Sequence, residues 1–156
     1  MATETESVKL VPLWFARYQN LFFTQYTPKA YYAVSKDGNV INSKTGRILI
    51  QTKDKKSKTG SGQTYPYIKL KCSDNKYHRF KTHRLIAAAY CPNSYNKNFV
   101  HHIDRNKENN ASSNLLWVRR SEHRELEKLW LIDREKYFQQ IKDIIAENSA
   151  ERKDNN

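Results

Sequence analysis

Three histidines lie near the middle of the chain, at positions 101, 102 and 123. An apolar strand is expected to end at His101 and His102, and neighbouring side chains on a strand point to opposite faces. We therefore expect one ring to face a metal ion and the other to face a water molecule beside a substrate. Imidazole suits both tasks, because it is a base near neutral pH and a good ligand of divalent transition metals. His123 falls on the first turn of the next predicted helix, where it can close a metal site against the strand.

This combination of residues matches the needs of phosphodiester hydrolysis. That reaction requires a base for the attacking water, a Lewis acid on the phosphate and support for the leaving oxygen. The amide of Asn114 stands where it can bridge the loop and hold the base in position. Taken alone, a His-His pair beside an Asn-rich turn is usually a surface loop. The joint spacing of the four residues favours a metal-dependent site instead.

Two strands, a polar loop and a helix are predicted to hold this site. The first strand ends at His102, an Asn-rich loop follows, and residues 115–118 return as a second strand in which Trp117 is expected to fill the core. Ser121 is predicted to open a long helix that reaches about Asn148, with an interruption at Asp133-Arg134. The second half of that helix is expected either to dock on the N-terminal aromatic residues or to pair with another chain as a homodimer.

The residues upstream show the alternation of β-strands. An aromatic segment, Leu10–Tyr26, is expected to pack on a small core. A helix of residues 83–90 is predicted to follow the strands, with Thr82 as its cap and Pro92 as its stop. His83 is expected at the start of that helix in a packing role, and His78 in solvent. The predicted strands are residues 31–35, 39–42 and 47–52, which form a meander, and a hairpin of residues 67–71 and 77–81.

The positive charge is concentrated in this β-rich part. The chain carries 28 Lys and Arg against 16 Asp and Glu, a net charge of +12. Residues 44–84 hold twelve basic residues against two acidic ones, and on the hairpin the basic side chains share one face while the other face is apolar. Such a face suits a ribbon laid along a phosphate backbone. The predicted DNA-binding residues are Lys69, Lys71, Arg79 and Lys81, together with Lys55 and Lys56 in the basic loop of residues 53–62.

Several other classes of protein are disfavoured. No stretch approaches the roughly 20 apolar residues of a transmembrane helix, so no membrane partner is expected. The first residues, MATETES, lack the pattern of a signal or transit peptide, which predicts a soluble intracellular protein. Cys72 and Cys91 form neither a disulfide framework nor a zinc clamp and are expected to be buried thiols.

The segment from His83 to Glu125 resembles the HNH homing endonucleases of phages, viruses and introns. The resemblance rests on His102 followed by IDRNKENN, on Asn114 followed by LLWV, and on His123. It extends upstream, where YYAVSKDGNVINSKTGRIL is similar to a β-rich DNA-binding motif found before the HNH domain in that family. The resemblance implies a ββα-metal fold with one divalent ion.

The resemblance also implies roles for individual residues. His102 is then the general base, His101 and His123 bind the metal, and Asn114 orients the catalytic loop. The residues expected to brace that loop through hydrogen bonds are Asp104, Asn109 and Asn110.

We therefore expect an α+β protein that cleaves double-stranded DNA with Mg²⁺, Mn²⁺ or another transition metal, in the cytoplasm of a phage- or virus-infected cell. One alternative is a non-catalytic DNA-binding or regulatory protein with an HNH-like fold. The other is an RNA-directed nuclease, because phosphate contacts do not reveal the sugar. The expected organisation is a disordered tail (1–8), a basic β-rich DNA-binding region (9–98), the ββα-metal motif (99–125), a C-terminal helix (126–148) and a second disordered tail (149–156).

Overall fold

The computed structural model describes residues 11–12, 26–55 and 64–150. The predicted tail of residues 1–8 and nearly all of the aromatic segment lie outside these ranges. In chain order the elements are β1 (Val11–Pro12), β2 (Tyr32–Val34), β3 (Val40–Asn42), β4 (Arg47–Ile48), β5 (Tyr67–Lys71), β6 (Tyr77–Lys81), α2 (Thr82–Tyr90), β7 (Phe99–His102), a 3-10 turn (Ser112–Asn114), β8 (Leu115–Val118), α3 (Arg120–Ile132) and α4 (Arg134–Ser149). The predicted α+β class is confirmed.

The first four strands form one antiparallel sheet in the order β1-β2-β3-β4. The predicted meander of β2, β3 and β4 is present, but β4 ends at Ile48 rather than at residue 52, because Thr52 pairs with Tyr67 of β5 instead. Strand β1 was not predicted. Both turns of the meander contain a glycine with positive φ, at Gly38 (93°) and Gly46 (70°). This left-handed conformation costs a glycine little, and the turn signals in the sequence therefore marked the strand ends correctly.

The hairpin of β5 and β6 has the predicted strands. Lys69 pairs with Arg79 and Ile68 with Phe80 across it. Ile68 and Leu70 are buried, while Lys69 and Arg79 are exposed, so the basic face and the apolar face are separate as predicted. Tyr67 lies on the same face as Lys69 but is buried, and the Arg79 guanidinium lies 4.3 Å from the centroid of its ring.

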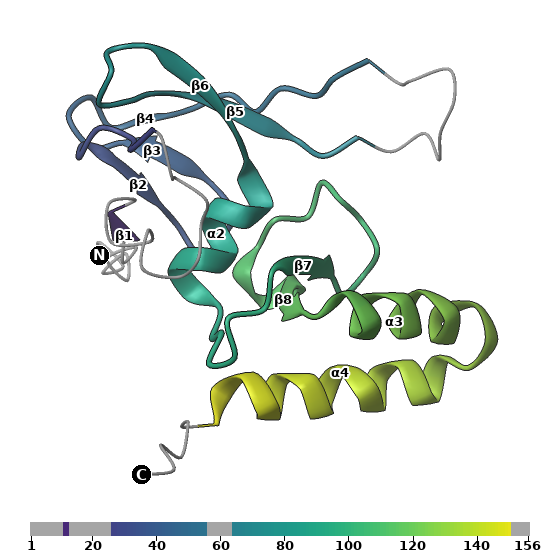
Figure 1. Cartoon of the computed structure of the whole chain (residues 1–156). Coiled ribbons are helices and arrows are strands. Elements are labelled where there is room, and N and C mark those ends of the chain that lie inside the picture. Colours follow the sequence, from purple (N-terminus) through teal and green to yellow (C-terminus); the bar gives the residue numbers. More distant parts are fainter. Residues whose placement is uncertain (1–10, 13–25, 56–63, 151–156) are drawn as a thin grey trace, which may run out of the picture.

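Helix α2 packs between the hairpin and the β7–β8 pair (Figure 1). The predicted cap was wrong, since Thr82 is the first helical residue and its buried hydroxyl has no hydrogen-bond partner among the described residues. Its backbone N–H donates to the carbonyl of Pro66 at 3.1 Å, which draws Thr82 into the core. His83 does lie at the start of the helix, where it is buried.

The C-terminal part is a pair of antiparallel helices rather than one helix (Figure 1). The helix is interrupted at Asp133. The Asp133 carboxylate accepts a hydrogen bond from the Lys136 N–H at 3.1 Å and so caps α4. Helix α3 begins at Arg120, one residue before the predicted start, and the Glu122 carboxylate accepts from the Arg119 N–H at 2.7 Å. α4 continues to Ser149, just past the predicted end of the helix.

Two clusters of buried apolar residues fill the molecule. The first joins β2, β3, β5, α2, β7 and β8, and the second joins β8 to α3 and α4. Trp117 is fully buried in the first cluster, and its indole N–H donates to the Ala87 carbonyl at 3.1 Å, which confirms its predicted core role. Cys72 and Cys91 are buried and free, as predicted. Among the described helices, none combines the length and the apolar character needed to cross a bilayer.

Candidate active site

The two histidines at the end of β7 diverge, as their positions on a strand require. His101 lies against Tyr137 of α4 and its ring centroid is 5.3 Å from that of His123. His102 lies on the other side, where its Nε2 is 2.9 Å from Oδ1 of Asn110. Both rings are buried. Strand β7 thus directs His101 toward α3 and α4 and His102 toward the polar loop, so the two rings can have different roles.

A third candidate ligand joins His101 and His123. His101, His123 and Glu127 each offer a ligand atom, and these atoms lie within 4.8 Å of one another. Glu127 was not predicted from the sequence, although its position four residues after His123 on a helix puts both side chains on one face. Two imidazole nitrogens and one carboxylate oxygen form a donor set that suits divalent transition metals. The residues therefore fit a single divalent ion.

Glu127 also contacts a cation of the loop. Nη1 of Arg105 lies 2.6 Å from Oε2 of Glu127, and Nε2 of His123 lies 3.8 Å from Oε1 of the same carboxylate. Arg105 adopts a positive φ of 66°, which turns the chain sharply after Asp104. The carboxylate is thus shared between the ligand cluster and a guanidinium that lines the same cleft.

Hydrogen bonding fixes the proton on His102. The Asn110 amide nitrogen faces Oε1 of Gln51 at 3.5 Å, so its carbonyl oxygen faces the imidazole. A carbonyl oxygen only accepts, and Nε2 of His102 must therefore carry the hydrogen, which leaves a lone pair on Nδ1. Burial lowers the pKa of His102, while the hydrogen bond to Asn110 raises it. The net lowering keeps this ring neutral and able to accept a proton at neutral pH.

The polar loop is held by a network of side-chain hydrogen bonds. Asn114 donates to Asp104 at 2.8 Å and to the carbonyl of Asn109 at 2.9 Å, and it accepts from the Asp104 N–H at 2.9 Å. The Asn109 amide donates to Asp104 at 2.8 Å. Asn114 thus makes three hydrogen bonds within the loop, and its role in orienting the catalytic loop stays a prediction. The residue in contact with His102 is Asn110.

A further histidine stands beside His102. The ring centroids of His83 and His102 are 5.1 Å apart, and the Tyr65 ring lies 4.7 Å from His83. Burial lowers the pKa of His83 to about 2, and no described residue forms a hydrogen bond with its Nδ1. This neighbour was not predicted from the sequence, because only the packing of α2 against β7 brings residues 83 and 102 together.

The site opens into a cleft that continues into a basic groove. The cleft has a volume of about 440 Å³ and includes His101, His102, His123 and Glu127 in its wall. An adjoining groove of about 650 Å³ shares Tyr65, Val100 and His123 with it. The cations that line the groove are Lys81, Arg84, Arg120 and Arg124, and its described lining contains no acidic residue.

The predicted DNA-binding residues are only partly near this cleft. Lys81 lines the groove at the end of β6. Lys69 and Arg79 lie further along the hairpin, and Arg79 pairs with Asp54 at 3.0 Å. Lys71 lies near the tip of the hairpin. Lys55 is exposed, and Lys56 lies outside the described residues. His78, expected in solvent, is half-buried, because its ring stacks on Tyr26 at 3.6 Å and bonds to Asp74 at 2.7 Å.

Comparison with known proteins places this site in a family. The sequence profile of the HNH endonuclease family matches residues 80–125, a segment that contains His101, His102, Asn114 and His123. The solved structure of the HNH homing endonuclease I-HmuI, described by its DNA binding and cleavage, is similar with a TM-score of 0.52 and 29% identity over 75% of this chain and 66% of that one. Residues 80–125 of the chain belong to the HNH endonuclease family.

Relatives of this chain come from a virus and a phage. An uncharacterized HNH endonuclease, L245, of Acanthamoeba polyphaga mimivirus is 34% identical over 55% of this chain and 24% of its own length. A second mimivirus protein, L247, is 38% identical over 59% and 22%. The DNA endonuclease I-HmuI of Bacillus phage SP01 is 37% identical over 58% and 47%. The chain thus spans less than half the length of these relatives. Glu127 and Tyr137 lie beyond the segment that the family profile matches.

Proposed function

We propose that this HNH endonuclease hydrolyses phosphodiester bonds of double-stranded DNA with one divalent metal ion. The observation that carries the proposal is the placement of a buried neutral imidazole, His102, beside the donor set of His101, His123 and Glu127 in one cleft. A base and a metal site in the same cleft are the two groups that phosphodiester hydrolysis needs.

His102 acts as the general base. Its Nδ1 lone pair takes a proton from the attacking water, and the carbonyl oxygen of Asn110 stabilises the imidazolium that forms. Arg105 and Lys107 line the cleft and provide cations that can contact the phosphate oxygens. His101, His123 and Glu127 would hold the divalent ion, which would supply a Lewis acid for the scissile phosphate.

The basic groove beside the cleft is the proposed path of the cleaved strand. A phosphate backbone requires a track of cations, and the described lining of the groove offers four of them without an acidic residue. Lys81 belongs to both the groove and the basic face of the hairpin, so the duplex can extend from the cleft along β6 toward Arg79 and Lys69. I-HmuI is a DNA endonuclease, and this relationship supports DNA over RNA as the substrate.

The donor set favours transition metals over magnesium. Imidazole binds manganese, cobalt or nickel better than magnesium, which prefers oxygen ligands and retains its waters. We expect Mn²⁺, Co²⁺ or Ni²⁺ to support cleavage at lower concentrations than Mg²⁺. A metal titration of the cleavage rate measures this order.

Digestion of matched plasmid DNA and RNA with added metal tests the proposal. We expect the plasmid to be cleaved and the RNA to remain intact. His102→Ala should lower the cleavage rate by at least ~100-fold, the typical value of a positioned base, with DNA affinity nearly unchanged. His78→Ala is the matched control, because His78 contacts Tyr26 and Asp74 outside the cleft. Binding without cleavage by the wild type would indicate a non-catalytic DNA-binding protein, and cleavage of RNA alone would indicate an RNA-directed nuclease.

A homodimer through the C-terminal helices stays a prediction. Large apolar side chains are exposed at the corner between α3 and α4, with Leu131 83% and Ile132 67% exposed. Sedimentation velocity at increasing protein concentration tests for self-association.

A further inference from the structure

We infer that Tyr137 of α4 is a positioning residue for the metal site, because its hydroxyl selects the tautomer of His101 whose Nδ1 is free to bind the ion. The inference rests on the proposed metal site and assigns a role to a helix that lies beyond the segment matched by the family profile.

Two short hydrogen bonds determine where the protons lie. The Tyr137 hydroxyl lies 2.7 Å from Nε2 of His101 and 2.7 Å from the carbonyl oxygen of Ile103. A hydroxyl has one proton, and a backbone carbonyl can only accept. The proton of Tyr137 is therefore donated to Ile103, and the hydroxyl oxygen accepts from His101. Nε2 of His101 then carries a hydrogen, and the nitrogen that retains a lone pair is Nδ1.

Burial leaves the Tyr137 hydroxyl as the hydrogen-bond partner of His101 Nε2 in place of water. Tyr137 is 0% exposed and His101 is 2% exposed, so bulk water has little access to replace the hydroxyl. The Tyr137 ring is fixed by edge-on contacts with Trp130 and Phe138, at centroid distances of 5.1 and 5.2 Å. A metal-binding histidine usually donates its other N–H to such a partner, which fixes both the tautomer and the ring orientation.

The two terminal helices then contribute to the site in different ways. Helix α3 supplies the candidate ligands His123 and Glu127, whereas α4 supplies none of the described candidate ligands and instead prepares His101. A carboxylate at position 101 has no tautomer to select. The dependence on Tyr137 should therefore vanish in a His101→Asp variant.

Long-range ¹H–¹⁵N correlation spectra of the full chain, recorded without metal or DNA, test the tautomer directly. We expect His101 to be protonated at Nε2 in the wild type and to change toward a mixture of tautomers in Tyr137→Phe. Tyr32→Phe is the matched control, because the Tyr32 hydroxyl accepts from the Lys71 N–H at 3.0 Å on the hairpin, and Tyr32 does not line the cleft that contains His101. A wild-type His101 protonated at Nδ1, or a Tyr137→Phe spectrum with unchanged His101 signals, would overturn the inference even if the protein cleaves DNA.

Calorimetric titration with Mn²⁺ alone tests the consequence for binding. Removing a partner of this kind typically weakens metal affinity by roughly 10- to 100-fold, and we expect that weakening in Tyr137→Phe but not in Tyr32→Phe. In the His101→Asp background, Tyr137→Phe should cause no further weakening. An equal effect in both backgrounds would mean that Tyr137 acts through general packing, and the inference would be wrong. If Tyr137→Phe does not fold, the wild-type spectrum alone decides between the two tautomers.

Discussion

Three imidazoles are buried around the end of β7. Burial lowers the pKa of His101 to about 3 and of His83 to about 2, and it lowers the pKa of His102 as well. A protonated ring at any of these positions would lose hydration and face nearby cations. The cluster therefore consists of neutral imidazoles at neutral pH, which is the form in which a histidine binds metal or accepts a proton.

His83 should make the stability of the protein depend on pH. Its pKa is about 2 in the folded chain against 6.5 in the unfolded chain, so below pH 6.5 the unfolded state binds one more proton. Stability is therefore fully present above pH 6.5 and is lost as the pH falls toward 2. The groups that disfavour its protonation are His102, Arg84, Lys81 and Lys107.

His83→Gln tests this prediction, because the amide does not titrate in that range. Between pH 6 and pH 5, the wild type should lose about 1 kcal/mol more free energy of unfolding than the variant. Urea unfolding at both pH values measures the difference. Equal losses would mean that His83 is protonated in the folded state and that its site is more hydrated than the structure indicates.

At the scale of elements, one turn connects the meander to the polar loop between β7 and β8. The turn between β2 and β3 lies against residues 110–112, where the Ser112 N–H donates to the Lys36 carbonyl at 2.7 Å. Gln51 donates to the Gly38 carbonyl at 3.1 Å and also faces Asn110. The support of His102 by Asn110 therefore depends on a glycine turn in the β-rich region.

Gly38→Ala should disturb the polar loop between β7 and β8. A Cβ at residue 38 would lie 2.6 Å from the Asn110 carbonyl oxygen, whereas a Cβ at Gly46 meets no described atom within 4 Å. Both positions have positive φ, so Gly46→Ala controls for backbone strain of roughly 1–2 kcal/mol. We expect Gly38→Ala to cost a further 1–3 kcal/mol, approximately, through overpacking. Its cleavage rate should fall about 10- to 100-fold through the displaced base. Equal stability and cleavage in the two variants would disprove the contact.

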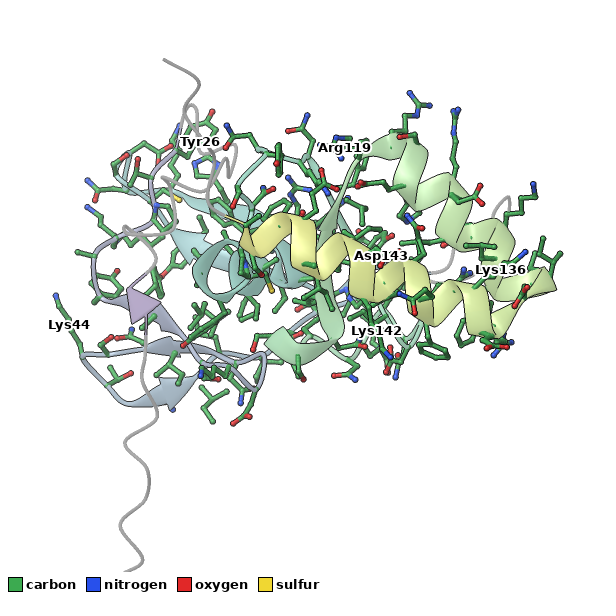
Figure 2. The ribbon with its side chains drawn as sticks, turned by 90° about the horizontal axis from the view of Figure 1, so that it is seen from below. Tyr26, Lys44, Arg119, Lys136, Lys142 and Asp143 are labelled. Carbon is green, nitrogen blue, oxygen red and sulfur yellow. The ribbon has the colours of Figure 1, made fainter. Side chains whose placement is uncertain are left out.

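The basic hairpin face should supply affinity for DNA. Removing a single phosphate contact lowers the slope of log affinity against log salt by about 0.9. Replacing Lys69, Lys71, Arg79 and Lys81 with Ala should therefore flatten that slope. Lys136→Ala with Lys142→Ala is the control, because both lysines are exposed on α4 (Figure 2), away from the hairpin. A slope that stays the same in the hairpin variant would leave the remaining groove cations, Arg84, Arg120 and Arg124, as the candidates for the DNA contact.

The elements show what the sequence can predict and what it cannot. Strand alternation and glycine turns are local, and they correctly predicted the hairpin faces and the ends of β2 and β3. The position of Asn114 in the loop also followed from local spacing. The contacts of Asn110 with His102 and of Tyr137 with His101 depend on how separate elements pack. Tyr137 has the helical spacing of a core residue. That spacing does not show whether the Tyr137 hydroxyl has a hydrogen-bond partner or whether the ring only packs in the core.

At the scale of the whole molecule, a buried lysine connects the two apolar clusters. The Lys97 side chain is 0% exposed and its Nζ lies 3.1 Å from Glu122 of α3 and 3.3 Å from Glu147 of α4. Arg119 contacts the same two carboxylates at 2.8 and 2.9 Å. Lys97 lies between α2 and β7, where Asn93 accepts from its N–H at 2.8 Å. The loop between α2 and β7 is thereby linked through Lys97 to α3 and α4, the two helices of the second apolar cluster.

Lys97→Met should loosen this connection. Removing one partner of a fully buried ion pair costs roughly 3–5 kcal/mol, but here both carboxylates keep Arg119 and are partly exposed, so we expect a loss of roughly 2 kcal/mol. Lys136→Met is the control, because its pair with Asp133 is 3.8 Å long and exposed, and it should change stability by less than about 0.5 kcal/mol. Adding Glu147→Gln to Lys97→Met should recover part of the loss, since it removes one of the carboxylates left without the lysine. Urea unfolding of the four proteins measures each step. A Lys97→Met protein as stable as the Lys136→Met control would mean that apolar packing alone joins the two clusters.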